Sequence, residues 1–138
     1  GASNLSSSGT YVMYSWTSID GFSKFGSYTG NNSTDGSFVY TGFKPALIIL
    51  KRSSDSGGWQ MLDNKRNPAT GGSEVDKYLL PNLGNGEYDG SSLSPAIRVD
   101  FYSNGFKLRS TESVYNSAGY NFVYACFAEG SFKDTNSR

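Results

Sequence analysis

The sequence predicts an all-β protein, an antiparallel two-sheet sandwich of the jelly-roll or concanavalin-like kind with about eight to ten short strands. Runs of aromatic and β-branched residues alternate with clusters of Gly, Ser and Asn, the pattern of strands joined by turns. An Asn-Gly dipeptide between apolar residues marks a hairpin. No stretch of the sequence has the sustained periodicity of an amphipathic helix.

The 138 residues are enough for one domain with its own hydrophobic core, which we assign to residues 10–132. Residues 1–9 are rich in Ser and are expected to be a flexible linker or a cloning remnant. Residues 133–138 are expected to be a polar tail.

The first part of the chain predicts two strands ahead of a central hairpin. The first strand covers residues 11–16, and the second, which is interrupted by glycines, covers residues 21–30. A polar turn at residues 31–36 separates them from residues 37–40, which lead into the hairpin.

The central hairpin begins with the longest apolar run of the chain, residues 46–50. This run is too short for a membrane span, and Leu and Ile fill it without alternation, so we expect a strand that is covered on both faces. A turn of Ser, Asp and Gly follows at residues 54–58, and the chain returns as residues 59–63.

After the central hairpin, a polar connection at residues 67–76 leads to a short strand at residues 77–80. A long loop, residues 81–94, comes next, and a loop of this length without its own periodicity is often functional. The last strand, residues 120–128, is apolar on both faces and is therefore expected at the centre of a sheet.

Residues 96–109 predict a hairpin that turns at Asn104-Gly105, the preferred dipeptide of a two-residue type I′ turn. The resulting register pairs Phe101 with Leu108, Asp100 with Arg109 and Tyr102 with Lys107. It separates the side chains by face, with Ile97, Val99, Phe101, Phe106 and Leu108 on the apolar face and Arg98, Asp100, Lys107 and Arg109 on the charged face.

The core is expected to form around three central strands, residues 46–50, 97–101 and 122–127. The predicted core residues are Leu47, Ile49, Leu62, Val99, Phe101, Leu108, Val123 and Phe127. The single cysteine, Cys126, lies in the last of these strands, and we interpret it as a small buried hydrophobic residue.

The composition argues against several classes of chemistry. The chain has no His, so the usual general base and the commonest metal ligand are absent, and one Cys allows neither an internal disulfide nor a thiolate zinc site. Residues 31–36 resemble the first half of a calcium loop, but Gly42 stands where the loop needs its bidentate Glu, so an ordinary polar turn is favoured. We therefore predict no metal site and no cofactor.

Acidic and basic residues are equal in number, 12 of each, so the chain carries no net charge that would attract nucleic acid. No apolar run is long enough to cross a bilayer. Neither nucleic-acid binding nor membrane insertion is predicted.

The candidate ligand-binding residues are Trp59, Tyr88, Asp89, Asn85 and Tyr28. Exposed aromatic rings can stack on sugar rings while Asp and Asn bind hydroxyl groups. Trp59 flanks the turn of the central hairpin and is the first candidate, and the alternative that Trp59 caps the hydrophobic core stays open. No catalytic residue is predicted: Glu87 with Asp89 is the nearest local carboxylate pair, but a solvated loop accounts for both.

Residues 11–16 and 122–127 share a pattern of an aromatic residue, Val, two further residues, a small residue and an aromatic residue. Such a repeat is expected in a segment cut from a longer polypeptide of tandem modules. Two interpretations of residues 10–20 stay open: a strand shared with a preceding module, or a strand left from it.

Several segments carry a resemblance to a known family: residues 21–31 (GFSKFGSYTGN), 38–46 (FVYTGFKPA), 63–66 (DNKR), 104–107 (NGFK) and 124–129 (YACFAE). From residue 11 to residue 132, the chain resembles an uncharacterised β-module that is common in large virion proteins of marine bacteriophages, including tail-fibre-like and appendage proteins. Ser15 and Thr17 depart from the pattern, in which Cys and His are usual. The resemblance implies a virion location and supplies neither a ligand nor an active site.

The resemblance leads to one functional hypothesis and two alternatives. The expected function is that of a non-enzymatic structural or adhesion module of a tail fibre or surface appendage, in contact with neighbouring virion modules and with host surface glycans. Because virion fibres are usually symmetric homo-oligomers, we expect self-association, with a trimer as the first guess. The alternatives are a lectin-like carbohydrate-binding domain and a fragment of a glycan depolymerase.

Overall fold

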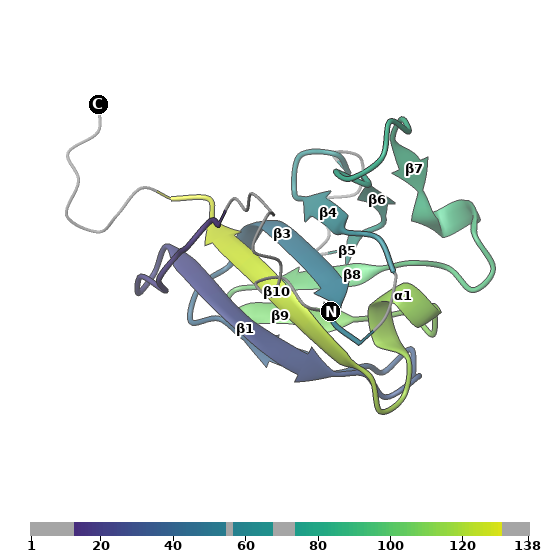
Figure 1. The fold of residues 1–138 in the computed structure, drawn as a ribbon, viewed down its shortest axis with the longest axis horizontal. Coiled ribbons are helices and arrows are strands. Elements are labelled where there is room, and N and C mark those ends of the chain that lie inside the picture. Colours follow the sequence, from purple (N-terminus) through teal and green to yellow (C-terminus); the bar gives the residue numbers. More distant parts are fainter. Residues whose placement is uncertain (1–12, 55–56, 68–73, 131–138) are drawn as a thin grey trace, which may run out of the picture.

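The computed structural model describes residues 13–54, 57–67 and 74–130, and it confirms the predicted two-sheet sandwich (Figure 1). Sheet A has the strand order β1-β10-β3-β4, sheet B has the order β2-β9-β8-β5, and β6 pairs with β7 in a small third sheet. The strands are β1 (Ser23–Thr29), β2 (Phe38–Tyr40), β3 (Pro45–Arg52), β4 (Gln60–Asp63), β5 (Glu74–Val75), β6 (Lys77–Tyr78), β7 (Tyr88–Asp89), β8 (Val99–Tyr102), β9 (Gly105–Leu108) and β10 (Asn121–Ala128). The helical turns η1 (Gly90–Ser92) and α1 (Ser113–Asn116) are the helices of the described residues, and neither is long and apolar enough to cross a membrane.

The core fills the space between the two sheets. Its buried side chains include Ile48, Leu50, Leu62, Phe122, Tyr124 and Cys126 from sheet A and Val99, Phe101, Phe106 and Leu108 from sheet B. The interpretation of Cys126 as a buried residue is confirmed, and burial raises the pKa of its thiol to about 12.

Four of the predicted core residues are confirmed as buried: Leu62, Val99, Phe101 and Leu108. The prediction is wrong for the other four, Leu47, Ile49, Val123 and Phe127. These residues lie on the outer face of sheet A and are half-buried or exposed. Both β3 and β10 are apolar at odd and even positions, so alternation does not mark which face turns inward. The prediction that residues 46–50 are covered on both faces is wrong for the same reason.

The β8–β9 hairpin forms, but its turn lies one residue earlier than predicted. Tyr102 pairs with Gly105 and Phe101 with Phe106, which leaves residues 103–104 as the two-residue loop. The predicted pairs Phe101–Leu108, Asp100–Arg109 and Tyr102–Lys107 are therefore wrong. Because the pairing moves by two positions, every side chain keeps its predicted face.

Gly105 is required by close packing rather than by the turn. Neither Asn104 nor Gly105 adopts the positive φ that a type I′ turn demands. A Cβ atom at position 105 would lie 2.2 Å from the carbonyl oxygen of Val39 in β2 and 2.8 Å from Cζ of Phe38. The missing side chain lets β2 and the Phe38 ring approach β9 closely.

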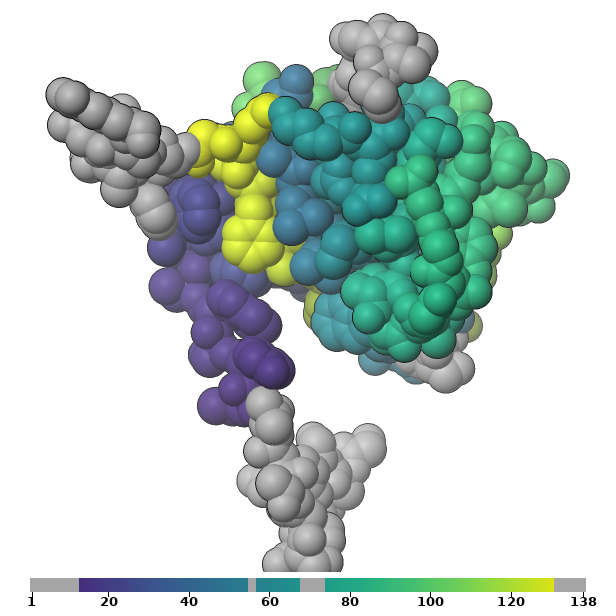
Figure 2. Space-filling view, turned by 90° about the horizontal axis from the view of Figure 1, so that it is seen from above, coloured from purple at the N-terminus to yellow at the C-terminus, as the bar shows by residue number. Residues whose placement is uncertain are grey.

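Residues 13–20 form an N-terminal arm instead of the predicted first strand, so that prediction is wrong for residues 13–16. In Figure 2 the arm, in dark purple, stands out from the body beside sheet A, whose strands follow one another as purple, yellow, blue and teal. At the free edge of β1, Ile19 exchanges two backbone hydrogen bonds with Ser23, of 3.0 and 2.9 Å. Ser18 Oγ accepts a hydrogen bond from the Phe25 amide at 3.1 Å.

Several predicted segments lie wholly or partly outside the described residues. They are the linker at residues 1–9, the first two residues of the strand predicted at residues 11–16, residues 55–56 of the central turn, residues 68–73 of the polar connection, and the tail from residue 131.

The strand predicted at residues 77–80 corresponds to β6, which Leu79 continues through an isolated bridge to Met61. The long loop at residues 81–94 contains structure that its sequence pattern did not indicate, namely β7 and η1. Tyr88 in β7 pairs with Tyr78 in β6, and Asp89 begins η1 by accepting a hydrogen bond from the Ser91 amide at 3.0 Å.

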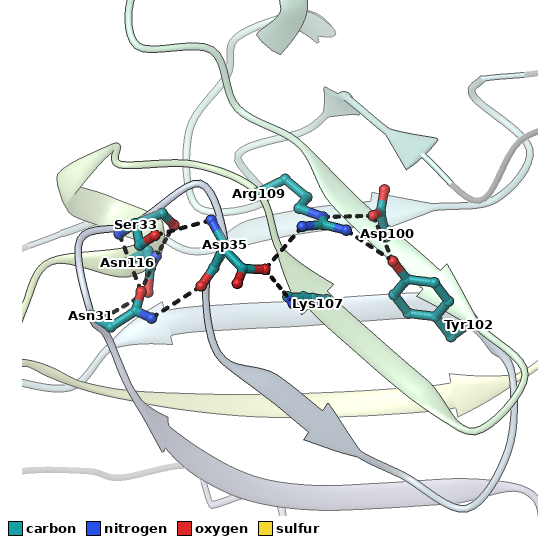
Figure 3. A network of polar contacts seen from close by, with 8 residues as sticks. All are labelled: Asn31, Ser33, Asp35, Asp100, Tyr102, Lys107, Arg109 and Asn116. Carbon is teal, nitrogen blue, oxygen red and sulfur yellow. Dashed lines mark hydrogen bonds and ion pairs between the residues drawn. The ribbon is translucent and has the colours of Figure 1, made fainter.

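The predicted polar turn at residues 31–36 is confirmed, and the buried side chain of Asn116 holds it in place (Figure 3). Asn116 Oδ1 accepts a hydrogen bond from the Asn31 amide at 3.0 Å. Asn116 Nδ2 lies 2.9 Å from Asn31 Oδ1, 2.9 Å from the Ser33 carbonyl oxygen and 3.0 Å from the Ser110 carbonyl oxygen. One side chain thus fixes the turn to α1 and to the segment that follows β9.

Candidate binding surfaces

Tyr28, one of the predicted ligand-binding residues, belongs to the core. Its hydroxyl group donates a hydrogen bond to the Tyr115 carbonyl oxygen at 2.7 Å, and its ring stacks on Phe122 with 4.9 Å between centroids. Burial raises the pKa of Tyr28 well above its usual value. A ring enclosed in this way offers no platform to a ligand, so its predicted role is corrected to a structural one.

The predicted residues Asn85, Tyr88 and Asp89 lie in and just before β7. Asn85 is exposed, while Tyr88 is half-buried and stacks on Tyr78 with 5.2 Å between ring centroids. One face of the Tyr88 ring is therefore already covered. None of these three residues lines the surface on which Trp59 lies, so the predicted set does not form a single site.

The local carboxylate pair of this segment is engaged in ion pairs. Glu87 lies 2.8 Å from Arg66 Nη1, and Asp89 lies 3.1 Å from Lys77 Nζ. Both cations lie on segments outside the loop that carries the carboxylates. Glu87 and Asp89 therefore form surface ion pairs that attach the loop to the sandwich.

Asp89 gives a testable dependence on pH. The Ser91 hydroxyl and then Lys77 stabilise the ionised carboxylate and lower its pKa from 3.8 to about 2. Because the folded-state pKa is lowered, these contacts stabilise the native state above about pH 4 and are lost as the pH falls towards 2. We expect a carboxyl ¹³C NMR titration to place the Asp89 midpoint near 2 and the Ser91→Ala variant to raise it. A wild-type midpoint near 4 would show that these contacts do not form in solution.

The outer face of sheet A carries a groove of about 270 Å³ that we call the two-tryptophan groove. Its apolar side chains are Trp16, Phe25, Ile49, Trp59, Val123 and Phe127. The Trp16 ring, from the N-terminal arm, stacks on Phe25 with 6.1 Å between centroids. Trp59 is 40% exposed, so the alternative that it caps the hydrophobic core is wrong.

The groove follows from the register of sheet A. Phe25, Ala125, Ile49 and Met61 are paired in one row across β1, β10, β3 and β4. Paired residues share a face of a sheet, and this row points away from the core. The groove is therefore a property of the sheet itself, and the arm adds one wall to it.

The outer face of sheet B carries a polar network (Figure 3). Arg109 Nε lies 2.8 Å from Asp100 Oδ2, and its Nη1 lies 3.2 Å from Asp35 Oδ1. Tyr102 donates a hydrogen bond to Asp100 at 2.9 Å and accepts one from Arg109 at 3.1 Å. Lys107 also pairs with Asp35, and this hydrogen bond and charge lower the pKa of Asp35.

Sequence reasoning missed the aromatic part of this face, although the signal was present. In β2, Phe38 and Tyr40 alternate with the buried Val39, so both rings point outwards, with 46% and 65% exposure. Phe38 contacts the Tyr102 ring at 6.1 Å between centroids. The exposed alternate positions of a strand with one buried face could have identified these residues.

The described residues contain no group of three or more His, Cys, Asp or Glu side chains that could hold a metal ion.

Comparison with known proteins assigns the chain to a family. A family model described as a domain of unknown function, DUF7483, matches residues 1–131. No curated protein and no solved structure matches the chain. The match extends over nearly the whole sequence, and the chain therefore belongs to the DUF7483 family.

Proposed function

We propose that this chain is a non-enzymatic structural and adhesion module of a bacteriophage virion, part of a tail fibre or surface appendage. The resemblance of its segments to modules of marine bacteriophage virion proteins supports the location. The observation that carries the structural role is the two-tryptophan groove, which leaves the apolar outer face of sheet A partly open to solvent.

An apolar sheet face of this kind favours a function in association. Soluble monomers seldom expose contiguous apolar patches, and larger ones mark contacts with other proteins. Here the patch involves the two central strands of sheet A, β3 and β10, rather than scattered side chains. A second copy of the module or a neighbouring virion module would bury it, and a symmetric trimer remains our first expectation.

The engagement of Glu87 and Asp89 with Arg66 and Lys77 supports a non-enzymatic role over a glycan depolymerase. A glycosidase needs two carboxyl groups roughly 5 to 10 Å apart, with one kept protonated at neutral pH. The pKa of Asp89 is lowered to about 2, which is opposite to what a general acid requires.

The solution mass of the chain tests the structural role. We expect light scattering to show a closed oligomer at high protein concentration. Combining Trp59→Ala with Val123→Thr should weaken the association about tenfold or more, because truncating a central aromatic residue removes much of the binding energy of an interface. Leu83→Ala, at an exposed loop residue outside the groove, is the matched control and should leave the mass unchanged. A wild-type chain that stays monomeric throughout the concentration range would argue against the proposal.

The second candidate function is that of a lectin-like domain. The exposed rings of Phe38 and Tyr40 beside the polar network of sheet B favour it, since sugar sites combine an aromatic platform with a few fixed polar groups.

A further inference from the structure

We propose that the outer face of sheet B binds a neutral oligosaccharide, with its polar end at Arg98 and its apolar end at Tyr40. This inference deepens the adhesion part of the proposed function by naming the ligand class and the site. It does not involve the two-tryptophan groove, so the two surfaces can be tested separately.

The polar end is a hollow of about 540 Å³ beside β8, lined by Thr34, Glu74, Pro95, Arg98, Asp100 and Arg109. Arg98 Nε is buried and forms no hydrogen bond with any described residue. Glu74 Oε1 lies 3.5 Å from it, an ion-pair separation that provides no hydrogen bond. Nε itself is closed to solvent, but the Arg98 side chain is 43% exposed, so its terminal guanidinium N–H groups can donate to a ligand hydroxyl in the hollow.

The charges around the hollow favour a neutral ligand. Arg98 is balanced by Glu74, Arg109 by Asp100, and Lys107 by Asp35, so three cations face three carboxylates. A free anion in the hollow would be repelled by carboxylates that lie as close as the cations that attract it. A free cation would be repelled by Arg98, Arg109 and Lys107 in the same way. A sugar hydroxyl both donates and accepts hydrogen bonds, so it can bind an arginine N–H and a carboxylate oxygen together.

The apolar end lies on the same face of the sheet. Tyr40, Gly105 and Tyr102 are paired across β2, β9 and β8, so two aromatic residues flank a position that has no side chain. Phe38 leans over Gly105 and contacts Tyr102. The Tyr40 ring is the most exposed of the three aromatic residues and is free to stack on the apolar face of a sugar ring.

The length of this face selects an oligosaccharide over a single sugar. Arg98 directly precedes β8 and Tyr102 ends it, a separation of roughly 13 Å at the usual rise per residue of a strand. The Asp100 and Arg109 side chains line the polar end and are fixed by their mutual contact at 2.8 Å. The site is therefore preformed, which reduces the entropy lost on binding.

A glycan array, followed by titration calorimetry, tests the inference. The array should carry neutral, sialylated and uronic-acid glycans, and the calorimetric probes are maltohexaose, cellohexaose and hexagalacturonic acid. We expect retention of neutral glycans in preference to the acidic ones. Tyr40→Ala and Arg98→Ala should each weaken binding about tenfold or more, the effect of losing one charged hydrogen bond or one stacking ring. Arg98→Lys should also weaken binding, because it keeps the charge and removes the planar set of guanidinium N–H donors.

Tyr120→Ala is the matched control, since it removes an exposed aromatic ring that lines neither the hollow nor the two-tryptophan groove and should leave sugar binding unchanged. Near-ultraviolet circular dichroism verifies that each variant is folded. The inference is overturned if no neutral glycan is retained, if acidic glycans bind better, or if Tyr40→Ala weakens binding no more than Tyr120→Ala does. Light scattering on the same samples separates the proposals: oligomers without sugar binding refute this site alone, and sugar binding by a strict monomer refutes the association surface alone.

Discussion

Replacing Gly105 by alanine is expected to lower the free energy of unfolding by about 3 kcal/mol, at the upper end of the usual cost of overpacking. The added Cβ would lie 2.2 Å from the backbone oxygen of Val39, and no side-chain rotation relieves a clash with backbone. β2 would have to move away from β9, which would disturb the three residue pairs that join them. Urea denaturation followed by tryptophan fluorescence measures the change.

Gly86→Ala is the control for this prediction, because nothing lies within 4 Å of a Cβ at that position. Its stability should stay the same or rise by up to about 1 kcal/mol, since alanine restricts the unfolded chain. If Gly105→Ala were as stable as Gly86→Ala, β2 and β9 would not approach each other as closely as described.

Asn116→Ala is expected to cost about 3 kcal/mol, because it removes a fully buried side chain and leaves three backbone groups without the partner that it supplies. The Asn31 amide would lose its acceptor, and the carbonyl oxygens of Ser33 and Ser110 would lose their donor. Amide hydrogen exchange should also become faster at Asn31 and Asn32, in the turn that the side chain holds in place.

Asn85→Ala is the matched control, because the same substitution at an exposed loop residue should change stability by no more than about 0.5 kcal/mol. Asn116→Asp adds a stricter comparison. It preserves the acceptor for the Asn31 amide but removes both donors, so it should be nearly as unstable as Asn116→Ala. Slow exchange at Asn31 in both variants would show that other contacts fix the turn.

The sequence predicted the fold class and most of the strands because both depend on local patterns. The hairpin at residues 96–109 shows the limit of prediction from local patterns. Alternation of apolar and charged residues assigned each side chain to its face, but the turn position depended on the packing of Gly105 against β2, a contact between segments far apart in the chain. The same limit explains why the inward faces of β3 and β10 were assigned wrongly. Both strands have apolar residues on both faces, so their sequences do not show which face packs against sheet B.

The candidate sites were less predictable than the fold for a related reason. Trp59 was identified as an exposed aromatic residue, but its partner Trp16 comes from an arm that was expected to be a strand. Asp100 and Arg109 were placed on one face, whereas their connection to Asp35 depends on how the turn at residues 31–36 folds over sheet B. Asn116, which fixes that turn, has no sequence signal, because a buried amide is recognised only by what surrounds it.

The N-terminal arm has a consequence for the solubility of the protein. An edge strand with free backbone groups is a template on which further chains can pair and grow into cross-β aggregates. Ser18 and Ile19 occupy the outward backbone groups of Ser23 and the amide of Phe25, so the first part of β1 cannot recruit another strand. Residues 18–19 thus block the edge-to-edge strand pairing that starts fibrils. The colloidal stability of concentrated protein depends on these residues staying bound to β1.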